Sequence, residues 1–265
     1  MGWTPRSEVW TRQPPRGWRI NSASPLAVGL TRLSMPGVDF GRTSTGLFTP
    51  ASLSAIPTIV GLAGNFNGSA SLDVGPMDSG ALTVMVGAIA DSGSLKYLFG
   101  LEYNGGAEPL TLRINSGSLE LSVYEGGVVN DFVSVSAPSA DTYNTFYGIT
   151  PPDGATDTHE VGFFTAQGEK TSATKSIQVS AKNGVAAFVG AGKGLGSPWR
   201  QYAKPIVWAA TWKRQLSAVE IAEVARNPWQ LYAKAATRIF LPAAGGAFVP
   251  ARYYFDMFGS GRFGG

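Results

Sequence analysis

The sequence predicts an all-β protein built as an antiparallel β-sandwich, and three observations lead to this prediction. Short apolar or alternating runs recur from about Leu47 to Gln215, turn dipeptides separate them, and no helical period intervenes. The clearest run alternates Leu119, Leu121 and Val123 with polar residues, the period of two of a strand with one apolar face. About eleven such strands with regular turns are typical of a sandwich or jelly roll.

Composition agrees with a folded chain that has many turns. Of the 265 residues, 44% are hydrophobic and 15% are charged, against roughly 25% charged residues in an average globular protein. The 34 glycines and 17 prolines imply frequent turns without reaching the level of low-complexity disorder. Sandwiches reach roughly 200–250 residues as one unit, so we expect a single domain over residues 46–232.

Residues 1–45 are predicted to form an extended N-terminal arm. Five prolines interrupt this segment, so neither an interior helix nor a central strand fits there. Its three tryptophans, Trp3, Trp10 and Trp18, are costly to leave in water. We expect them to pack either on a neighbouring subunit or on the domain of the same chain.

The predicted strands follow the arm, with Asn104-Gly105, Asp153-Gly154 and Asn183-Gly184 among the turns that supply positive φ. The polar stretch 150–160 is expected to be a loop. In chain order the strand runs are IPTIVGLAG (56–64), ASLDVG (70–75), ALTVMVGAIA (81–90), LKYLFGLEY (95–103), PLTLRIN (109–115), SLELSVYE (118–125), DFVSVS (131–136), EVGFFTA (160–166), KSIQVSA (175–181), VAAFVG (185–190) and PIVWAATW (205–212).

One short helix is predicted after the last strand. Ser217 and Glu220 have the spacing of a capping box, and Asn227-Pro228 stops the helix. Ile221 and Val224 give it one apolar face, and a helix of about ten residues needs packing to be stable. The residues expected to close against the sandwich are Leu216, Ile221, Val224 and Trp229.

The last segment, residues 233–265, is predicted to be an extended apolar tail. A soluble monomer seldom exposes so much contiguous apolar surface, and aromatic side chains dominate interface energies when a neighbour's pocket holds them. We therefore expect both ends of the chain to contact adjacent subunits, which implies a homo-oligomer. The expected contact residues are Trp3, Trp10 and Trp18 at one end and Phe240, Tyr253, Tyr254, Phe255 and Phe258 at the other.

Catalytic groups are scarce in this sequence, and we expect a protein without enzymatic activity. There is no cysteine, and the one histidine, His159, falls in the predicted polar loop, where a solvated side chain is commoner than a base. The nucleophile elbow G-x-S-x-G is absent. Glycosidases of sandwich fold need carboxylates at alternate positions of one strand, and no run here has Glu-x-Asp or Glu-x-Glu, so Glu102, Glu120, Glu125 and Glu160 are expected to face solvent.

No metal or cofactor is expected from the residues themselves. Asp153 with Asp157, or Asp73 with Asp78, has the chemistry for a calcium site, but turn-forming Asp is the stronger interpretation. The segment Gly190–Gly196 is rich in glycine but departs from the spacing G-x-x-x-x-G-K-[ST], so we expect a flexible loop between strands and no phosphate site.

Charge and hydropathy exclude two classes of partner. The 21 Lys and Arg residues exceed the 18 Asp and Glu residues by three, and they are scattered through the middle of the chain. Nucleic-acid binding needs clustered cations interleaved with aromatic residues, so we expect none. No apolar stretch reaches the roughly 20 residues of a membrane helix or resembles a signal peptide, so we expect no membrane partner.

The segment from Val207 to Tyr232 resembles the closing strand and helix of laminin-G/concanavalin-like sandwich domains. In that family an aromatic-rich strand ends in a basic residue followed by L-S-x-x-E-[IV] and a short helix. The ending N-P-W-Q-L-Y is similar to that of virion-associated proteins of tailed bacteriophages, which often begin with the W-T-R-Q-P segment found here at 10–14. The matching residues near the C-terminus are Trp208, Trp212, Leu216, Ser217, Glu220, Ile221, Asn227, Pro228 and Trp229.

This resemblance implies a structural protein of a bacteriophage virion, assembled in the host cytoplasm. It would decorate the head, or belong to the tail or baseplate, and would dock on other virion proteins through its terminal arms. The alternative is a tail-associated adhesin that binds carbohydrate on the host surface, and a diverged glycan hydrolase is a further rival. Calcium is implied by the family alone, because the laminin-G calcium ligands have no matching positions here.

Overall fold

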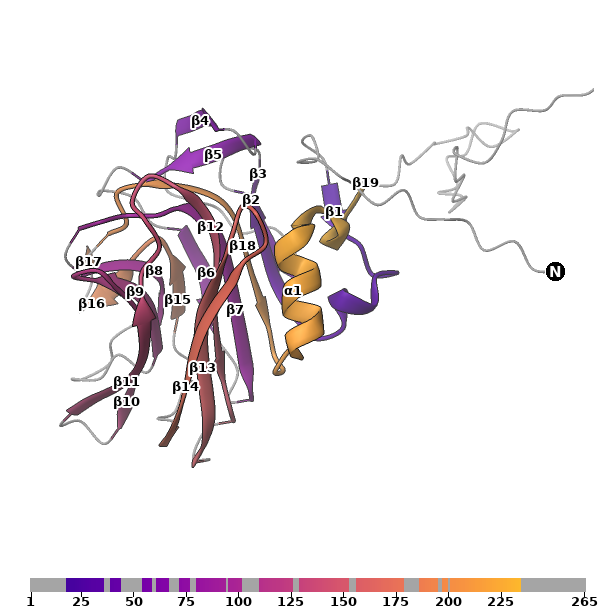
Figure 1. Ribbon diagram of the computed structural model, residues 1–265. Helices are drawn as coiled ribbons and strands as arrows, with labels where there is room; N and C mark the ends of the chain where they lie inside the picture. Colours follow the sequence, from indigo (N-terminus) through magenta and orange to yellow (C-terminus); the bar gives the residue numbers. More distant parts are fainter. Residues whose placement is uncertain are drawn as a thin grey trace, which may run out of the picture.

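The structure, a computed structural model, describes residues 18–35, 39–43, 54–58, 61–66, 72–76, 80–93, 95–101, 110–125, 129–152, 156–178, 186–194, 197–199 and 201–234. This part of the chain folds as a sandwich of two antiparallel β-sheets, with one α-helix packed outside the larger sheet (Figure 1). The all-β class, the antiparallel sandwich and the short C-terminal helix predicted from the sequence are confirmed.

The smaller sheet has six strands, and every neighbouring pair in it is antiparallel. Its order is β11 (Val129–Ser136), β10 (Ser118–Glu125), β9 (Leu110–Asn115), β8 (Lys96–Leu101), β15 (Ala186–Val189) and β6 (Leu72–Pro76).

The larger sheet has nine strands, and seven of them pair side by side in one continuous order. The order is β14 (Lys170–Gln178), β13 (Thr156–Thr165), β12 (Tyr143–Thr150), β7 (Leu82–Ile89), β18 (Pro205–Trp212), β2 (Leu30–Met35) and β3 (Asp39–Thr43). Off this path, β5 (Gly61–Asn65) pairs with β18 and with β4 (Ser54–Thr58). Two short ladders complete the sheets: β1 (Trp18–Ile20) with β19 (Tyr232–Lys234), and β16 (Gly192–Gly194) with β17 (Ser197–Trp199).

Two apolar cores lie on opposite faces of the larger sheet. Because side chains alternate along a strand, Val84 and Val86 of β7 enter the core between the sheets, whereas Met85 enters a second core on the outer face. The inner core contains, among others, Leu112, Leu121, Phe146, Val161 and Phe163. The outer core contains, among others, Leu26, Leu33, Trp208, Trp212, Ile221, Val224 and Trp229.

Helix α1 (Ala218–Arg226) covers the outer core as predicted. Ser217 caps the helix and forms the reciprocal capping box with Glu220. Ile221 and Val224 are fully buried, while Leu216 is 3% and Trp229 is 7% exposed. The short helix η2 (Pro228–Leu231) follows at once, so the Asn-Pro stop turns the chain back onto the sheet.

The expected N-terminal arm of residues 1–45 is corrected, because the sandwich begins well before residue 46. Strand β2 pairs with β18 and β3, and its Leu33 is fully buried. The 3-10 helix η1 (Pro25–Ala27) accommodates Pro25 in its first turn, where no backbone donor is needed. Trp212 Nε1 donates a hydrogen bond of 2.7 Å to the Leu26 carbonyl. A chain that started at residue 46 would lose two strands of the larger sheet.

The central strand β12 is absent from the predicted runs, and the expected loop at 150–160 is wrong in part. Seven of the eight residues of β12 are buried, so both faces are covered and the alternation that marks a half-exposed strand is missing. Strand β13 begins at Thr156, inside the expected loop. Its polar first half, TDTHE, gave no apolar signal.

The glycine-rich segment 190–196 was expected to be a flexible loop, but its residues 192–194 form β16 and pair with β17. Gly190, just before it, has φ +76°, and a Cβ there would lie 2.2 Å from Phe66 Cδ1. Glycine at this position therefore serves backbone geometry and close packing. The run 56–64, predicted as one strand, belongs to the hairpin of β4 and β5.

Candidate functional site

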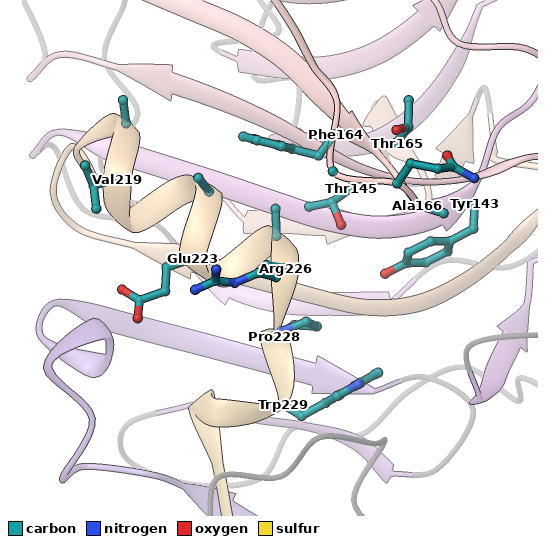
Figure 2. Close-up of a pocket in the computed structure, with 15 residues that line it drawn as sticks. Tyr143, Thr145, Phe164, Thr165, Ala166, Val219, Glu223, Arg226, Pro228 and Trp229 are labelled. Carbon is teal, nitrogen blue, oxygen red and sulfur yellow. The ribbon is translucent and has the colours of Figure 1, made fainter.

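A groove of about 860 Å³ lies between helix α1 and the edge of the larger sheet (Figure 2). One wall is formed by α1 and the start of η2, and the other by β12, the end of β13 and the turn that leads to β14. This volume falls within the roughly 300–1,000 Å³ of small-molecule sites. The lining residues are Tyr143, Thr145, Phe164, Thr165, Ala166, Gln167, Gly168, Ala218, Val219, Ala222, Glu223, Ala225, Arg226, Pro228 and Trp229.

The floor of the groove is apolar and buried, whereas its rim is open. Phe164 and Trp229 are each 7% exposed, and Thr145 is 2% exposed. In Figure 2 the Phe164 ring extends from β13 toward α1, and Trp229 lies at the opposite end below Pro228. Ala166, Gln167 and Gly168 on one side and Ala218, Val219 and Ala222 on the other are exposed. The rings are thus fixed by the outer core while part of each remains at the groove surface.

Tyr143 brings a hydroxyl group to the groove. Trp208 Nε1 donates a hydrogen bond of 3.0 Å to Tyr143 Oη, which leaves the tyrosine O–H able to donate to a ligand. Burial raises the pKa of Tyr143 and outweighs hydrogen bonds from Trp208 and Thr145 that lower it. The hydroxyl therefore stays protonated at neutral pH and acts as a neutral donor.

The helix wall is anchored at its N-terminus by a network around Arg214. Both guanidinium NH groups bond to Glu220, at 3.0 and 2.6 Å, and Arg214 Nε donates to the Val28 carbonyl at 2.7 Å. The hydrogen bonds from Arg214 lower the pKa of Glu220 to about 2. Thr83 Oγ1 connects the same segment to β7, because it donates to the Arg214 carbonyl and accepts from Leu216 N.

The C-terminal end of the helix is held by Gln230. Its Nε2 donates to the carbonyls of Glu223 and Asn227, at 3.1 and 2.9 Å, and so satisfies acceptors that the last helical turn leaves open. Both ends of α1 are therefore tied down. The groove is a pre-formed surface feature.

The groove carries a balanced pair of charges among its lining residues. Glu223 and Arg226 are both exposed and are three residues apart on α1, where side chains are neighbours. Figure 2 shows both side chains projecting from the same side of the helix. Thr145, Thr165 and Gln167 supply the remaining hydrogen-bonding side chains together with Tyr143.

A second polar cluster lies on the outer face of the same strands. Glu160 Oε1 accepts from Tyr147 Oη at 2.6 Å and from Lys170 Nζ at 2.8 Å. Burial raises the pKa of Glu160, but hydrogen bonds from Lys170 and Tyr147 outweigh it and hold the pKa below its usual range. Tyr147 is fully buried and stacks near Phe164, with ring centroids 5.9 Å apart. This cluster supports the floor of the groove from the side.

Glu120, expected to face solvent, is buried instead. It is 5% exposed and pairs with Arg113 on the outer face of the smaller sheet, where Arg113 Nε lies 2.7 Å from Glu120 Oε2. Thr111 and Ser122, on the same face, are 0% and 3% exposed. The alternation of Leu119, Leu121 and Val123 gave the correct strand but assigned its polar face wrongly to water.

His159, expected in an exposed loop, is fully buried in β13. Its Nε2–H donates to the Ile177 carbonyl of β14 at 3.0 Å. The nearby ion pair of Lys175 and Asp131 joins β14 to β11 and, with hydrogen bonding from Lys175, lowers the pKa of Asp131. The histidine is therefore part of the edge where the two sheets meet, away from the groove.

Within the described ranges, no three His, Asp or Glu side chains gather closely enough to hold a metal ion. Of the aspartates considered for calcium, Asp157 is exposed on β13 and Asp73 belongs to β6, whereas Asp78 and Asp153 lie outside the described residues. In the same part of the chain, no helix is long and apolar enough to cross a membrane.

The predicted site residues divide into two groups. Nearly all of the aromatic contact residues lie outside the described residues, as do Glu102 and residues 235–265 of the predicted tail; these contact residues are Trp3, Trp10, Phe240, Tyr253, Tyr254, Phe255 and Phe258. Trp18 is described only as a member of β1, opposite Lys234. Of the residues that match the laminin-G/concanavalin-like family, Pro228 and Trp229 line the groove, whereas Trp208 and Trp212 belong to the outer core beneath it.

Tyr143 and Phe164, the groove residues contributed by the sheet, were missed by sequence reasoning. Phe164 lies in the run 160–166 that was correctly predicted as a strand, but nothing local shows that it faces the helix. Tyr143 opens the strand that was not predicted at all. A pairing of β12 and β13 with Asn144 opposite Thr165 brings the two residues together, and such long-range register is invisible in one sequence.

No protein-family model matches this sequence, and no curated protein matches it either. Among solved structures, domain 4 of AbnA, an extracellular GH43 arabinanase from Geobacillus stearothermophilus in complex with arabinotriose, is similar with a TM-score of 0.53. The identity is 13%, over 74% of this chain and 98% of that domain. This similarity shows a shared β-sandwich fold.

Two further similarities are weaker. The CBM40 module of the Ruminococcus gnavus IT-sialidase bound to α2,3-sialyllactose gives a TM-score of 0.46 and 15% identity over 56% of this chain and 83% of that one. A mutant NanB sialidase from Streptococcus pneumoniae gives a TM-score of 0.49 and 16% identity over 66% of this chain. The match spans only 28% of the sialidase.

Proposed function

We propose that this protein is a non-catalytic β-sandwich subunit that binds carbohydrate in the groove beside α1. The observation that carries the proposal is the lining of that groove: two rigidly held rings, Phe164 and Trp229, lie beside the hydroxyl of Tyr143 and the side chains of Thr145 and Gln167. Sugars present both apolar C–H faces and hydroxyl groups, so they need this combination. The similar arabinanase domain was solved with arabinotriose, which supports a sugar as ligand.

The absence of catalysis is supported by the charges of the groove. Retaining and inverting glycosidases both use two carboxyl groups, either about 5–5.5 Å or roughly 6.5–9.5 Å apart. Among the described residues that line the groove, Glu223 is the only one with a carboxylate. Glu160, the next carboxylate on these strands, is engaged by Tyr147 and Lys170. Binding, without bond cleavage, fits this set of groups.

The proposal places the protein on the virion of a tailed bacteriophage, as an adhesin of the tail. Its support is the resemblance of the W-T-R-Q-P and N-P-W-Q-L-Y segments to virion-associated phage proteins. Of the two functions that the sequence suggests, carbohydrate binding has the groove and the arabinanase domain behind it. A purely structural subunit that docks through aromatic arms is supported only by the resemblance to phage proteins and by the aromatic composition of the chain ends. Copy number per purified particle separates them, because decoration requires many copies and an adhesin few.

The direct test is a glycan array followed by titration calorimetry on the full chain. A variant Ala222→Arg fills the groove from its exposed helical wall with a residue that favours helix, and should weaken glycan binding at least about tenfold. Thr174→Arg on the exposed part of β14 is the matched control and should bind as the wild type does. Unchanged binding by Ala222→Arg would show that the groove is not the site.

A further inference from the structure

We infer that the groove beside α1 selects neutral oligosaccharides and discriminates against acidic glycans such as sialylated or uronic-acid chains. This inference rests on the proposed carbohydrate-binding function and names the class of sugar. It follows from the position of each charged group at the groove.

Recognition of a sugar carboxylate needs a cation that is held in place and shielded from water. Strong binding comes from a bidentate arginine, fixed by its own partners, in a site with few competing waters. Arg226 is the one cationic residue among the lining residues that the structure describes, and it is exposed at the rim in the last turn of α1. No hydrogen bond within the described ranges orients its guanidinium. Its attraction for an anion is therefore screened by solvent.

Glu223 works against an acidic ligand directly. It is three residues before Arg226 on the same helix and lines the same wall, so the two side chains are neighbours and an acidic sugar held by Arg226 would approach a carboxylate. The formal charges of Glu223 and Arg226, the charged residues among the described lining residues, sum to zero. An acidic glycan gains little from Arg226 and is opposed by Glu223.

The remaining groups are suited to a neutral sugar. Tyr143 donates through a protonated hydroxyl, and Thr145, Thr165 and Gln167 offer neutral donors and acceptors. Phe164 and Trp229 line the groove and are each 7% exposed, and the C–H bonds of a sugar face would pack favourably on the part of each residue that stays exposed. Both lysines of β14 are engaged elsewhere, Lys170 with Glu160 and Lys175 with Asp131.

The test compares matched neutral and acidic ligands on the full chain by titration calorimetry. Lactose and arabinotriose serve as neutral probes, and 3′-sialyllactose adds one carboxylate to lactose. We expect the acidic probe to bind at least about tenfold more weakly than its neutral partner, and neutral binding to change less than about twofold between 50 and 500 mM salt.

A charge variant sharpens the result. Glu223→Gln should raise the affinity for sialyllactose relative to lactose by about three- to tenfold, because it removes the opposing carboxylate. Asp157→Asn removes one carboxylate charge in the same way at an exposed position of β13 outside the groove. It should leave the ratio of sialyllactose to lactose affinity unchanged. Sialyllactose that binds more tightly than lactose, or a ratio insensitive to Glu223→Gln, overturns the inference while leaving carbohydrate binding in place. Failure of every probe and of the glycan array to bind overturns the proposed function itself, and the inference with it.

Discussion

The outer faces of the two sheets are both buried at their centres, but by opposite chemistry. On the larger sheet, Trp208 and Trp212 create an apolar surface that α1 covers, and the edge of that cover leaves the groove. On the smaller sheet the corresponding surface is polar, and Arg113 pairs with Glu120 at less than a tenth of full exposure. An apolar outer face is stabilised by any apolar cover of the right shape, whereas a polar one requires exact partners.

This difference explains why the groove lies where it does. Helix α1 covers part of the apolar outer face of the larger sheet, and rings at the edge of this cover line the groove. Phe164 and Trp229 are such residues, shared by the outer core and the groove. On the described part of the smaller sheet's outer face, the polar side chains of Thr111, Arg113, Glu120 and Ser122 are buried. Ligand binding is therefore expected on the larger sheet.

The largest effect is expected where the polar face is broken. Arg113→Met leaves the buried Glu120 carboxylate without a cation and with the Asn115 amide as its remaining described donor, and the free energy of unfolding should fall by about 3–5 kcal/mol. Urea denaturation of this variant is compared with the double variant Arg113→Met/Glu120→Leu, which replaces the pair by apolar groups and should recover most of the loss. If the single variant costs less than about 1 kcal/mol, the face is not sealed from water as described.

A somewhat smaller loss of the free energy of unfolding is expected when a buried residue of the apolar face is truncated. Ile221→Ala removes a fully buried side chain of α1 and should cost about 2–5 kcal/mol, depending on how far the helix settles into the cavity. Val219→Ala on the same helix is the control, because Val219 is 76% exposed and should change stability by less than about 0.5 kcal/mol. Equal effects of the two substitutions would contradict the packing of α1 on the sheet.

Between the two faces, the edge of the inner core provides a third test. His159→Ala leaves the buried Ile177 carbonyl without its imidazole donor and should lower the free energy of unfolding by about 1–3 kcal/mol. Thr158→Ala, at the exposed neighbouring position of β13, should have little effect. Thermal unfolding of both variants suffices for the comparison. A His159→Ala variant that is as stable as the wild type would contradict the buried position of the histidine and support the solvated side chain that the sequence suggested.

The two faces also differ in how far the sequence predicted them. The helix, its capping box and its buried residues followed from local signals, because Ser217, Glu220 and Asn227 act within one turn of their neighbours. The burial of Glu120 did not, since its partner Arg113 lies on an adjacent strand and alternation alone marks a polar face as solvated. His159 was misplaced for the same reason.

The groove needed still longer-range information. Trp229 was singled out by its motif, but Tyr143 and Phe164 reach it through the pairing of β12 with β13 and through the packing of α1 on that sheet. Strand β12 lacks alternation because it is central and covered on both faces. Fold class and helix were therefore predictable from local pattern, whereas a site assembled from three separated segments was not.

The smallest expected effect concerns the anchor of α1, and it depends on pH. The Glu220 carboxylate accepts hydrogen bonds from Arg214, from Ser217 N and from Ser217 Oγ, and its pKa falls from 4.5 to about 2. A folded-state pKa below the unfolded value means that the stabilisation is fully present above about pH 4.5 and is lost as the pH falls toward 2. Glu220→Gln keeps the amide oxygen for the cap but removes the charge. Since the side chain is 27% exposed, we expect a loss of about 1 kcal/mol at pH 7.

That loss should shrink as the pH is lowered, because the wild type gives up the same contribution between pH 4.5 and about 2 while the variant has none to lose. Urea midpoints of the two proteins, measured from pH 7 to pH 2.5, should therefore converge at the acidic end. Glu223→Gln on the same helix controls for the change in net charge, since Glu223 is exposed and does not contact Arg214 through any described hydrogen bond. A difference between wild type and Glu220→Gln that stays constant down to pH 2.5 would mean that the Arg214 contact does not hold the helix wall of the groove, and that α1 depends on its buried face alone.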